Sequence, residues 1–181
     1  MKWIGLYSQT GSELRTIADY IGQEPEVFTN SENMFSFKQF HNLKRGTHKE
    51  IMNWLMSQEE QCLVTLHGYL RILPPEVCEK HIIFNGHPAA IHLYPELKGK
   101  DKQIDAFTHK DKYPVIGSVV HRVTAELDAG EIVQYITVPN NVRSVEEAFR
   151  VLKTVSLFTW KEFVDENRDL WSTVNRQDNA A

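Results

Sequence analysis

The sequence has few of the features that mark specialised classes of protein. Its 181 residues include two cysteines, Cys62 and Cys78, too few for a disulfide framework or a zinc cluster. The net charge is −4, so the excess positive charge of a nucleic-acid-binding surface is missing. No apolar run approaches the roughly 20 residues that span a membrane, and the first residues do not resemble a signal peptide. We therefore expect a cytoplasmic protein with no nucleic-acid or membrane partner, in which Cys62 is a buried, reduced thiol.

What remains is the pattern of an α/β domain. Short apolar runs predict strands, and apolar residues at helical spacing predict helices. The expected strands are 3–7, 25–29, 62–66, 82–84, 115–123 and 131–138, and the expected helices are 14–21, 47–58, 103–107 and 145–164. This alternation predicts a mostly parallel sheet, followed by an antiparallel pair of strands near the C-terminus. We expect one domain over residues 1–170, with an irregular connection over 30–46 and a frayed tail over 171–181.

Asn85 and His87 are the first candidates for chemistry. They follow Ile82–Phe84, a predicted short buried strand, and open α/β sheets bind ligands just beyond the ends of their strands. In an extended chain the two side chains point to the same side, and Gly86 lets a substrate approach the backbone. Asparagine and neutral histidine can polarise a carbonyl, stabilise an oxyanion and move a proton, as acyl transfer requires. From these residues alone, a turn capped by Asn85 beside an exposed His87 is the simpler interpretation.

Two further segments are candidate binding surfaces. The turn Gly11-Ser12-Glu13 precedes the first predicted helix, where backbone N–H groups can bind an anion. Plain capping of the helix by Ser12 explains the same residues. Residues 70–73 end at a double proline and fit either a binding wall made of backbone or a packed connection. The residues alone leave both pairs of alternatives open.

Three segments together resemble the folate-dependent formyltransferases, above all those that act on glycinamide ribonucleotide. They are Leu70-Arg71-Ile72-Leu73-Pro74, Asn85-Gly86-His87-Pro88, and Gly117–Val123 running into Glu126-Leu127-Asp128-Ala129-Gly130. The resemblance implies a Rossmann-like fold with helices on both faces of the sheet. It also implies transfer of a formyl group from 10-formyltetrahydrofolate to a primary amine. The remaining histidines form no convincing metal-ligand cluster, so no metal is expected.

The resemblance also implies roles for particular residues. Asn85, His87 and Asp128 match the catalytic residues of the family, with Asp128 holding the imidazole or an ordered water and favouring cationic His87. The segments matching the walls around the pterin ring are Leu70, Arg71, Ile72 and Leu73 on one side and Ala125, Glu126 and Leu127 on the other. Gly11, Ser12 and Glu13 match the loop that binds the acceptor. His121 also matches a family histidine, although we expect it to pack against its strand.

The acceptor half departs from the family pattern. The family's Gly-Ser-Asn loop ends here in Glu13, which would repel a phosphate unless its side chain turns away. The last predicted helix reads Lys153-Thr154-Val155-Ser156-Leu157 where the family carries a glutamate for the acceptor. The expected acceptor is glycinamide ribonucleotide or a related small amine, and an amino-sugar nucleotide is the alternative. A formyltetrahydrofolate hydrolase and a non-catalytic folate-binding module are further alternatives, and a homodimer is left open.

Overall fold

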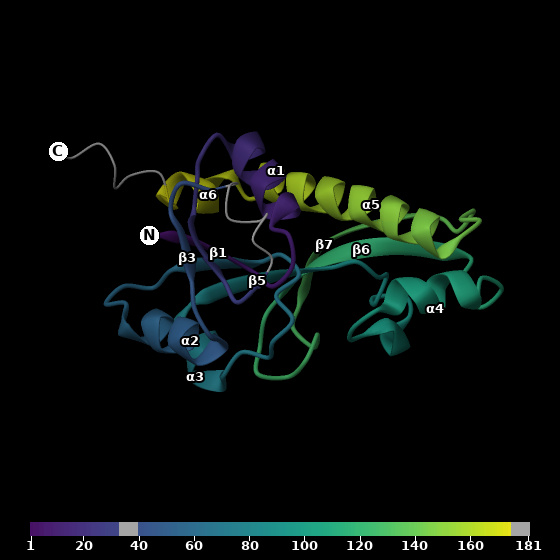
Figure 1. Ribbon diagram of the computed structural model, residues 1–181. Coiled ribbons are helices and arrows are strands. Elements are labelled where there is room, and N and C mark those ends of the chain that lie inside the picture. Colours follow the sequence, from purple (N-terminus) through teal and green to yellow (C-terminus); the bar gives the residue numbers. More distant parts are fainter. Residues whose placement is uncertain (33–39, 175–181) are drawn as a thin grey trace.

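A seven-stranded sheet forms the centre of the computed structural model, which describes residues 1–32 and 40–174 (Figure 1). The strand order is β3-β2-β1-β4-β5-β6-β7. The strands are β1 Trp3–Tyr7, β2 Glu26–Thr29, β3 Leu43–Arg45, β4 Leu63–Leu66, β5 Ile82–His87, β6 Val115–Arg122 and β7 Ile132–Pro139. The first five strands pair in parallel, whereas β6 is antiparallel to both β5 and β7. The predicted fold class is confirmed.

Helices cover both faces of the sheet. They are α1 Ser12–Ile21, α2 His48–Ser57, α3 Pro75–Lys80, α4 Lys102–Thr108, α5 Val145–Glu166 and α6 Arg168–Val174, and a 3₁₀ turn, η2, spans Pro95–Leu97. Alternation along β1 divides the core: Trp3 and Tyr7 pack with α1, α5 and α6, whereas Ile4 and Leu6 pack with α2 and α3. In Figure 1, α1 and α5 accordingly lie on one side of the sheet and α2 and α3 on the other.

Local signals explain where the helices next to the site begin and end. Thr47 and Glu50 form a reciprocal capping box at the start of α2. The hydroxyl of Ser144 accepts the N–H of Glu147 at the start of α5. Gly22 ends α1 with a φ of 75°, a left-handed conformation that favours glycine. The predicted helices at 47–58 and 145–164 agree with α2 and α5 to within two residues. The first helix begins at Ser12, two residues before the predicted start, and the prediction that Ser12 caps it is wrong, because Gly11 is the N-cap and no side chain caps this end.

Two predictions about the irregular parts of the chain are wrong. The connection 30–46 contains β3, a short strand with one apolar residue, whose backbone pairs with the edge of β2. The tail does not fray at residue 171, because α6 continues to Val174 and buries Trp171 edge-on against Trp3, with 5.0 Å between ring centroids. Helix α3 was not predicted at all. Residues 33–39 and 175–181 lie outside the described residues, so the predictions for them stay predictions.

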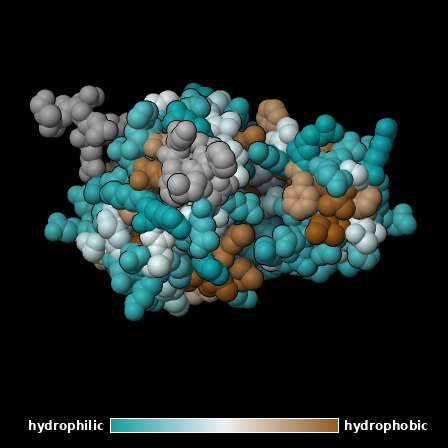
Figure 2. All heavy atoms as spheres, in the orientation of Figure 1, coloured by the Kyte–Doolittle hydropathy of each residue, from teal (hydrophilic) through white to brown (hydrophobic). Residues whose placement is uncertain are grey.

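Exposed hydrophobic side chains are scattered over the molecule. On the face shown in Figure 2, hydrophilic side chains predominate and hydrophobic ones gather in separate patches. Leu70, Ile72 and Leu127 are 43 %, 62 % and 53 % exposed, and they line the pocket described below. Within residues 1–32 and 40–174, no helix is both long and apolar enough to cross a membrane. Of the two free cysteines, Cys62 is buried, as expected, and Cys78 is partly buried.

Candidate active site

Asn85 and His87 lie at the carboxyl end of β5. The prediction that they follow the strand is wrong, because β5 continues through them by pairing with β6: Asn85 lies opposite His121. Gly86 between them has no room for a side chain, since a Cβ there would lie 2.3 Å from Nε1 of Trp160. By strand alternation, Asn85 and His87 therefore point to the face opposite Trp160.

His87 is buried, and both of its ring nitrogens face oxygen atoms. Nε2 lies 2.9 Å from the carbonyl oxygen of Leu97 and donates to it, which leaves Nδ1 as the unprotonated nitrogen of the neutral ring. Nδ1 lies 3.7 Å from Oδ2 of Asp128. Burial lowers the pKa of His87 below its ordinary value, more than Asp128 and the Leu97 carbonyl raise it. As expected, Asp128 favours the cationic form of His87, but burial has the larger effect, so the neutral ring is favoured.

Asp128 lies in the loop between β6 and β7, with its backbone in the left-handed region at a φ of 47°. Its side chain is 7 % exposed, and Oδ2 accepts the backbone N–H of Gly99 at 3.0 Å. Burial alone would raise the pKa of Asp128, but contacts with His121, His87 and the Gly99 N–H lower it to about 2. Asp128 is thus an anion fixed beside both histidines.

His121 is part of this cluster rather than a residue that only packs against its strand. Its Nδ1 donates to the carbonyl oxygen of Arg122 at 2.9 Å, so Nε2 carries the lone pair in the neutral ring. Nε2 lies 3.1 Å from Nδ2 of Asn85 and 3.5 Å from Oδ1 of Asp128. The imidazole thereby fixes the orientation of the Asn85 amide: one N–H donates to His121 and the second remains available. This role of His121 was missed because it depends on the cross-strand pairing of Asn85 with His121, and the sequence alone does not give the register of β5 against β6.

A pocket of about 750 Å³ opens in front of these residues. Its lining includes Asn85, His87, His121 and Asp128, together with most of the residues predicted to bind the donor: Leu70, Arg71, Ile72, Leu73, Glu126 and Leu127. Ala125, the remaining predicted donor contact, is exposed and does not line the pocket. The volume falls in the range of small-molecule sites, and the exposed Leu70, Ile72 and Leu127 side chains offer apolar surface to a ring. These features fit a small molecule that carries an apolar ring.

The predicted acceptor loop reaches the same pocket. Gly11, in the loop after β1, and Ser12 and Glu13, in the first turn of α1, line it next to residues 67–73, which follow β4. The two segments are joined by hydrogen bonds, from the N–H of Leu70 to Oγ of Ser8 at 3.0 Å and from the N–H of Ser8 to the carbonyl oxygen of Gly68 at 3.2 Å. The Glu13 side chain turns toward α5, where Oε1 accepts the hydroxyl of Ser156 at 2.6 Å.

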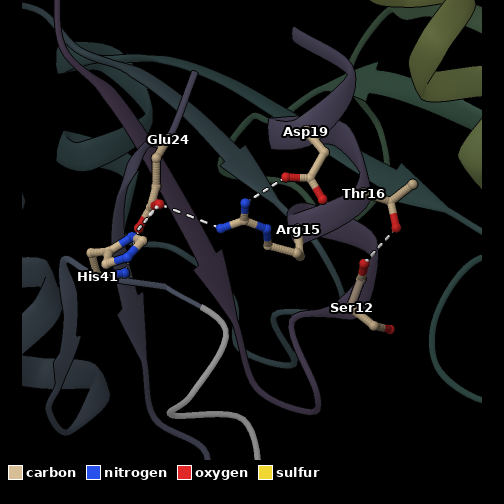
Figure 3. A network of polar contacts seen from close by, with 6 residues as sticks. All are labelled: Ser12, Arg15, Thr16, Asp19, Glu24 and His41. Carbon is tan, nitrogen blue, oxygen red and sulfur yellow. Dashed lines mark hydrogen bonds and ion pairs between the residues drawn. The ribbon is translucent and has the colours of Figure 1, made fainter. Parts of the chain in front are cut away.

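Polar contacts hold the first turns of α1 in place behind this loop (Figure 3). Arg15 bonds to Asp19 one turn further along the helix and to Glu24 at 3.3 Å. Glu24 also lies 3.0 Å from Nδ1 of His41, across the end of α1. The hydroxyl of Thr16 donates to the carbonyl oxygen of Ser12 at 3.0 Å. These contacts anchor α1, whose first turn carries Glu13.

A buried histidine outside this pocket, His81, has structural partners. His81 is fully buried and its Nε2 lies 2.9 Å from the carbonyl oxygen of Leu55, while its Nδ1 accepts the N–H of Cys62 at 3.1 Å. This pattern joins α2, β4 and β5. Over the part of the chain that the structure describes, no three His, Cys, Asp or Glu side chains are arranged to hold a metal ion.

Comparisons with known proteins identify the family of this chain. Residues 8–149 match the family model described as formyl transferase, a span that includes Asn85, His87 and Asp128. The chain is 26 % identical over 160 residues to the phosphoribosylglycinamide formyltransferase of Escherichia coli (strain K12), covering 77 % of this chain and 73 % of that protein.

Two solved structures share the fold. Phosphoribosylglycinamide formyltransferase from Streptococcus pneumoniae TIGR4 aligns with a TM-score of 0.75 at 20 % identity, over 91 % of this chain and 97 % of that one. A formyltetrahydrofolate deformylase from Pseudomonas syringae pv. tomato str. DC3000 aligns with a TM-score of 0.71 at 21 % identity, over 89 % of this chain and 59 % of that one. At these identities the structures show the fold alone. From the match over residues 8–149, the chain belongs to the formyl transferase family.

Proposed function

We propose that this protein transfers a formyl group from 10-formyltetrahydrofolate to a primary amine, with glycinamide ribonucleotide or a related small amine as the acceptor. The observation that carries the proposal is the cluster of Asn85, His87 and Asp128 in one pocket, between the two predicted substrate walls. A formyl group and an amine held in such a pocket react without a covalent enzyme intermediate. The residues must stabilise charge on the formyl oxygen and move a proton.

Asn85 is suited to stabilise the formyl oxygen as its negative charge develops. One N–H of its amide is bound to Nε2 of His121, which holds the amide in place, and the second N–H is free to donate. A donor fixed before the reaction stabilises developing charge without the cost of reorganising at that moment. In this mechanism His121 is a positioning residue that acts through Asn85.

His87 is suited to receive the proton of the attacking amine. Its neutral form presents the lone pair of Nδ1, because Nε2 donates to the carbonyl oxygen of Leu97. Once Nδ1 is protonated, the ring becomes a cation beside the anionic Asp128, 3.7 Å away, which stabilises it. The proton can then pass to the leaving nitrogen of the donor. Asp128 therefore supports His87 when it is charged, although burial keeps the resting ring neutral.

The donor is expected to lie between residues 70–73 and the loop that carries Leu127 and Asp128. The fit rests on the pocket volume and on the exposed apolar side chains of Leu70, Ile72 and Leu127. When bound there, 10-formyltetrahydrofolate supplies the formyl carbon.

A second reaction on the same residues is hydrolysis, in which water replaces the amine. The fold shared with a formyltetrahydrofolate deformylase favours keeping this alternative. The acceptor loop at Gly11–Glu13 supports amine transfer, because hydrolysis has no need of an acceptor wall inside the pocket. A folate-binding module without turnover has no need of the whole catalytic cluster.

One experiment separates these functions. Purified protein is mixed with 10-formyltetrahydrofolate alone, or with glycinamide ribonucleotide, glycinamide or an amino-sugar nucleotide, and tetrahydrofolate and formylated amine are both measured. Formylated amine equal to the tetrahydrofolate released supports the proposal and identifies the acceptor. Release at the same rate without amine indicates the hydrolase, and binding without release indicates the module.

A further inference from the structure

Glu13 is a carboxylate placed in the reaction pocket but turned away from bulk solvent. Its side chain is 19 % exposed, and it lines the same pocket as Asn85 and His87. Each of its oxygens is fixed by a different element: Oε1 accepts the hydroxyl of Ser156 on α5 at 2.6 Å, and Oε2 lies 2.9 Å from Nδ1 of His67 beyond β4. The carboxylate is therefore held rigidly between two elements distant in the sequence.

The charge of Glu13 has no fixed cation beside it. Across residues 1–32 and 40–174, no lysine or arginine lies within ion-pair distance of this carboxylate, and its partners are a hydroxyl and an imidazole. Burying a charge without such a partner is costly. Because each carboxylate oxygen has two acceptor positions, Glu13 can still accept further hydrogen bonds from a ligand. The site thus offers an unused negative acceptor to whatever enters the pocket.

A second observation ties Glu13 to the reaction centre. The His67 side chain is fully buried, and its ring packs on Trp160 with 4.5 Å between centroids. Nε2 of His67 and Nε1 of Trp160 are both buried without a hydrogen-bond partner in the described part of the chain. Trp160 in turn packs against Gly86, between Asn85 and His87. Buried, unpartnered polar atoms are uncommon, and here two of them belong to the packed rings of His67 and Trp160, which connect Glu13 to Gly86.

We propose that Glu13 selects the acceptor: its carboxylate accepts hydrogen bonds from N–H or O–H groups of the acceptor and excludes an anionic group from that position. The proposal rests on the proposed formyl transfer. The donor groups are either those of the amine itself or hydroxyls of a sugar that carries it. In both cases the acceptor presents polar hydrogens, not phosphate oxygens, to Glu13.

The test uses the full-length protein and the variant Glu13→Gln, which keeps the shape of the side chain and removes its charge. Glu162→Gln, an exposed site on α5 outside the pocket, is the matched charge control. The probe is glycinamide ribonucleotide, or the amino-sugar nucleotide if that is the amine formylated by the wild type. Calorimetry should show acceptor binding weakened tenfold or more by Glu13→Gln and unchanged by Glu162→Gln, because charge-assisted hydrogen bonds are lost. Binding of 10-formyltetrahydrofolate should stay within threefold of the wild type in both variants.

Two analogues distinguish the sources of the donor groups. One has a methyl group in place of the amine, and the other lacks the hydroxyls of the sugar that carries the amine. The analogue that lacks the group bound by Glu13 should be insensitive to Glu13→Gln, whereas the other should lose affinity like the parent. Ser156→Ala, which removes a hydrogen bond but no charge, should weaken acceptor binding less than threefold.

Some results would overturn the assignment. Unchanged or tighter acceptor binding in Glu13→Gln would do so, tighter binding indicating that the carboxylate repels a phosphate. A loss of acceptor affinity in Ser156→Ala equal to that in Glu13→Gln would also do so. It would mean that the affinity depends on the local structure around Glu13 and not on its charge. If the wild type formylates no amine at all, the proposed function fails instead, and the two failures are therefore distinguishable.

Discussion

Replacing Asp128 with asparagine tests how the buried anion supports the site. The asparagine side chain would keep the shape of the aspartate and an oxygen for the N–H of Gly99, but it removes the charge beside His87 and His121. The pKa of Asp128 is lowered from 3.8 to about 2 in the folded protein. At 1.36 kcal/mol per pKa unit, the ionised carboxylate contributes about 2 kcal/mol to folding.

The sign of the effect follows from the lowered pKa. A carboxyl group with a folded pKa below its unfolded value stabilises the protein above pH 4, and this contribution is lost as the pH falls toward 2. The difference in unfolding free energy between wild type and Asp128→Asn, measured with urea, should therefore be largest at pH 7. At pH 3 the part of this difference that depends on the ionisation of Asp128 should be roughly half of its value at pH 7.

The same variant changes the titration of His87. Because Asp128 raises the pKa of His87 against the effect of burial, Asp128→Asn should lower that pKa further, as followed by NMR of the imidazole. A His87 pKa that stays the same or rises would refute the electrostatic account. So would a stability difference that is independent of pH between 7 and 3.

Three further predictions concern the residues around this anion. Asn85→Ala and His87→Ala should each lower kcat about 100- to 1000-fold with normal folate binding, and near-normal activity in either would contradict its role. Because burial lowers the pKa of His87 below the ordinary histidine value of 6.5, kcat should be constant between pH 7.5 and 6.5 and fall only at lower pH. A rise of kcat toward acid pH would mean that the cation is the active form. Gly86→Ala should destabilise the protein by about 1–3 kcal/mol in urea unfolding, because its Cβ would meet the buried Trp160, whereas Gly46→Ala, with its nearest atom at 3.4 Å, should cost less.

The sequence predicts those parts of the site that depend on short segments. Asn85 and His87 follow an apolar run, so their place at a strand end follows from local pattern and sheet geometry, and the added length of β5 changes only the boundary. The long helix α5 and all strands except β3 were predicted for the same reason. Asp128 was predicted from the resemblance, since its distance to His87 depends on the path of the loop.

The parts that were missed depend on long-range packing. The contact between Glu13 and Ser156 joins residues 143 positions apart, and no local pattern indicates it. The charge of His87 depends on a competition between burial and Asp128, whose sign requires the structure. Strand β3 contains one apolar residue and forms because β2 offers a free edge, while α6 is fixed by Trp171 against Trp3.

The most direct test of the account is amine-dependent release of tetrahydrofolate by the wild type, compared with Asn85→Ala and His87→Ala. If the pocket performs formyl transfer, 10-formyltetrahydrofolate should be consumed only when an acceptor amine is present. One formylated amine should then appear for each tetrahydrofolate, and both products should fall together by about 100-fold or more in the two variants. Consumption at an equal rate without any amine, or equal rates in wild type and variants, would contradict the central claim.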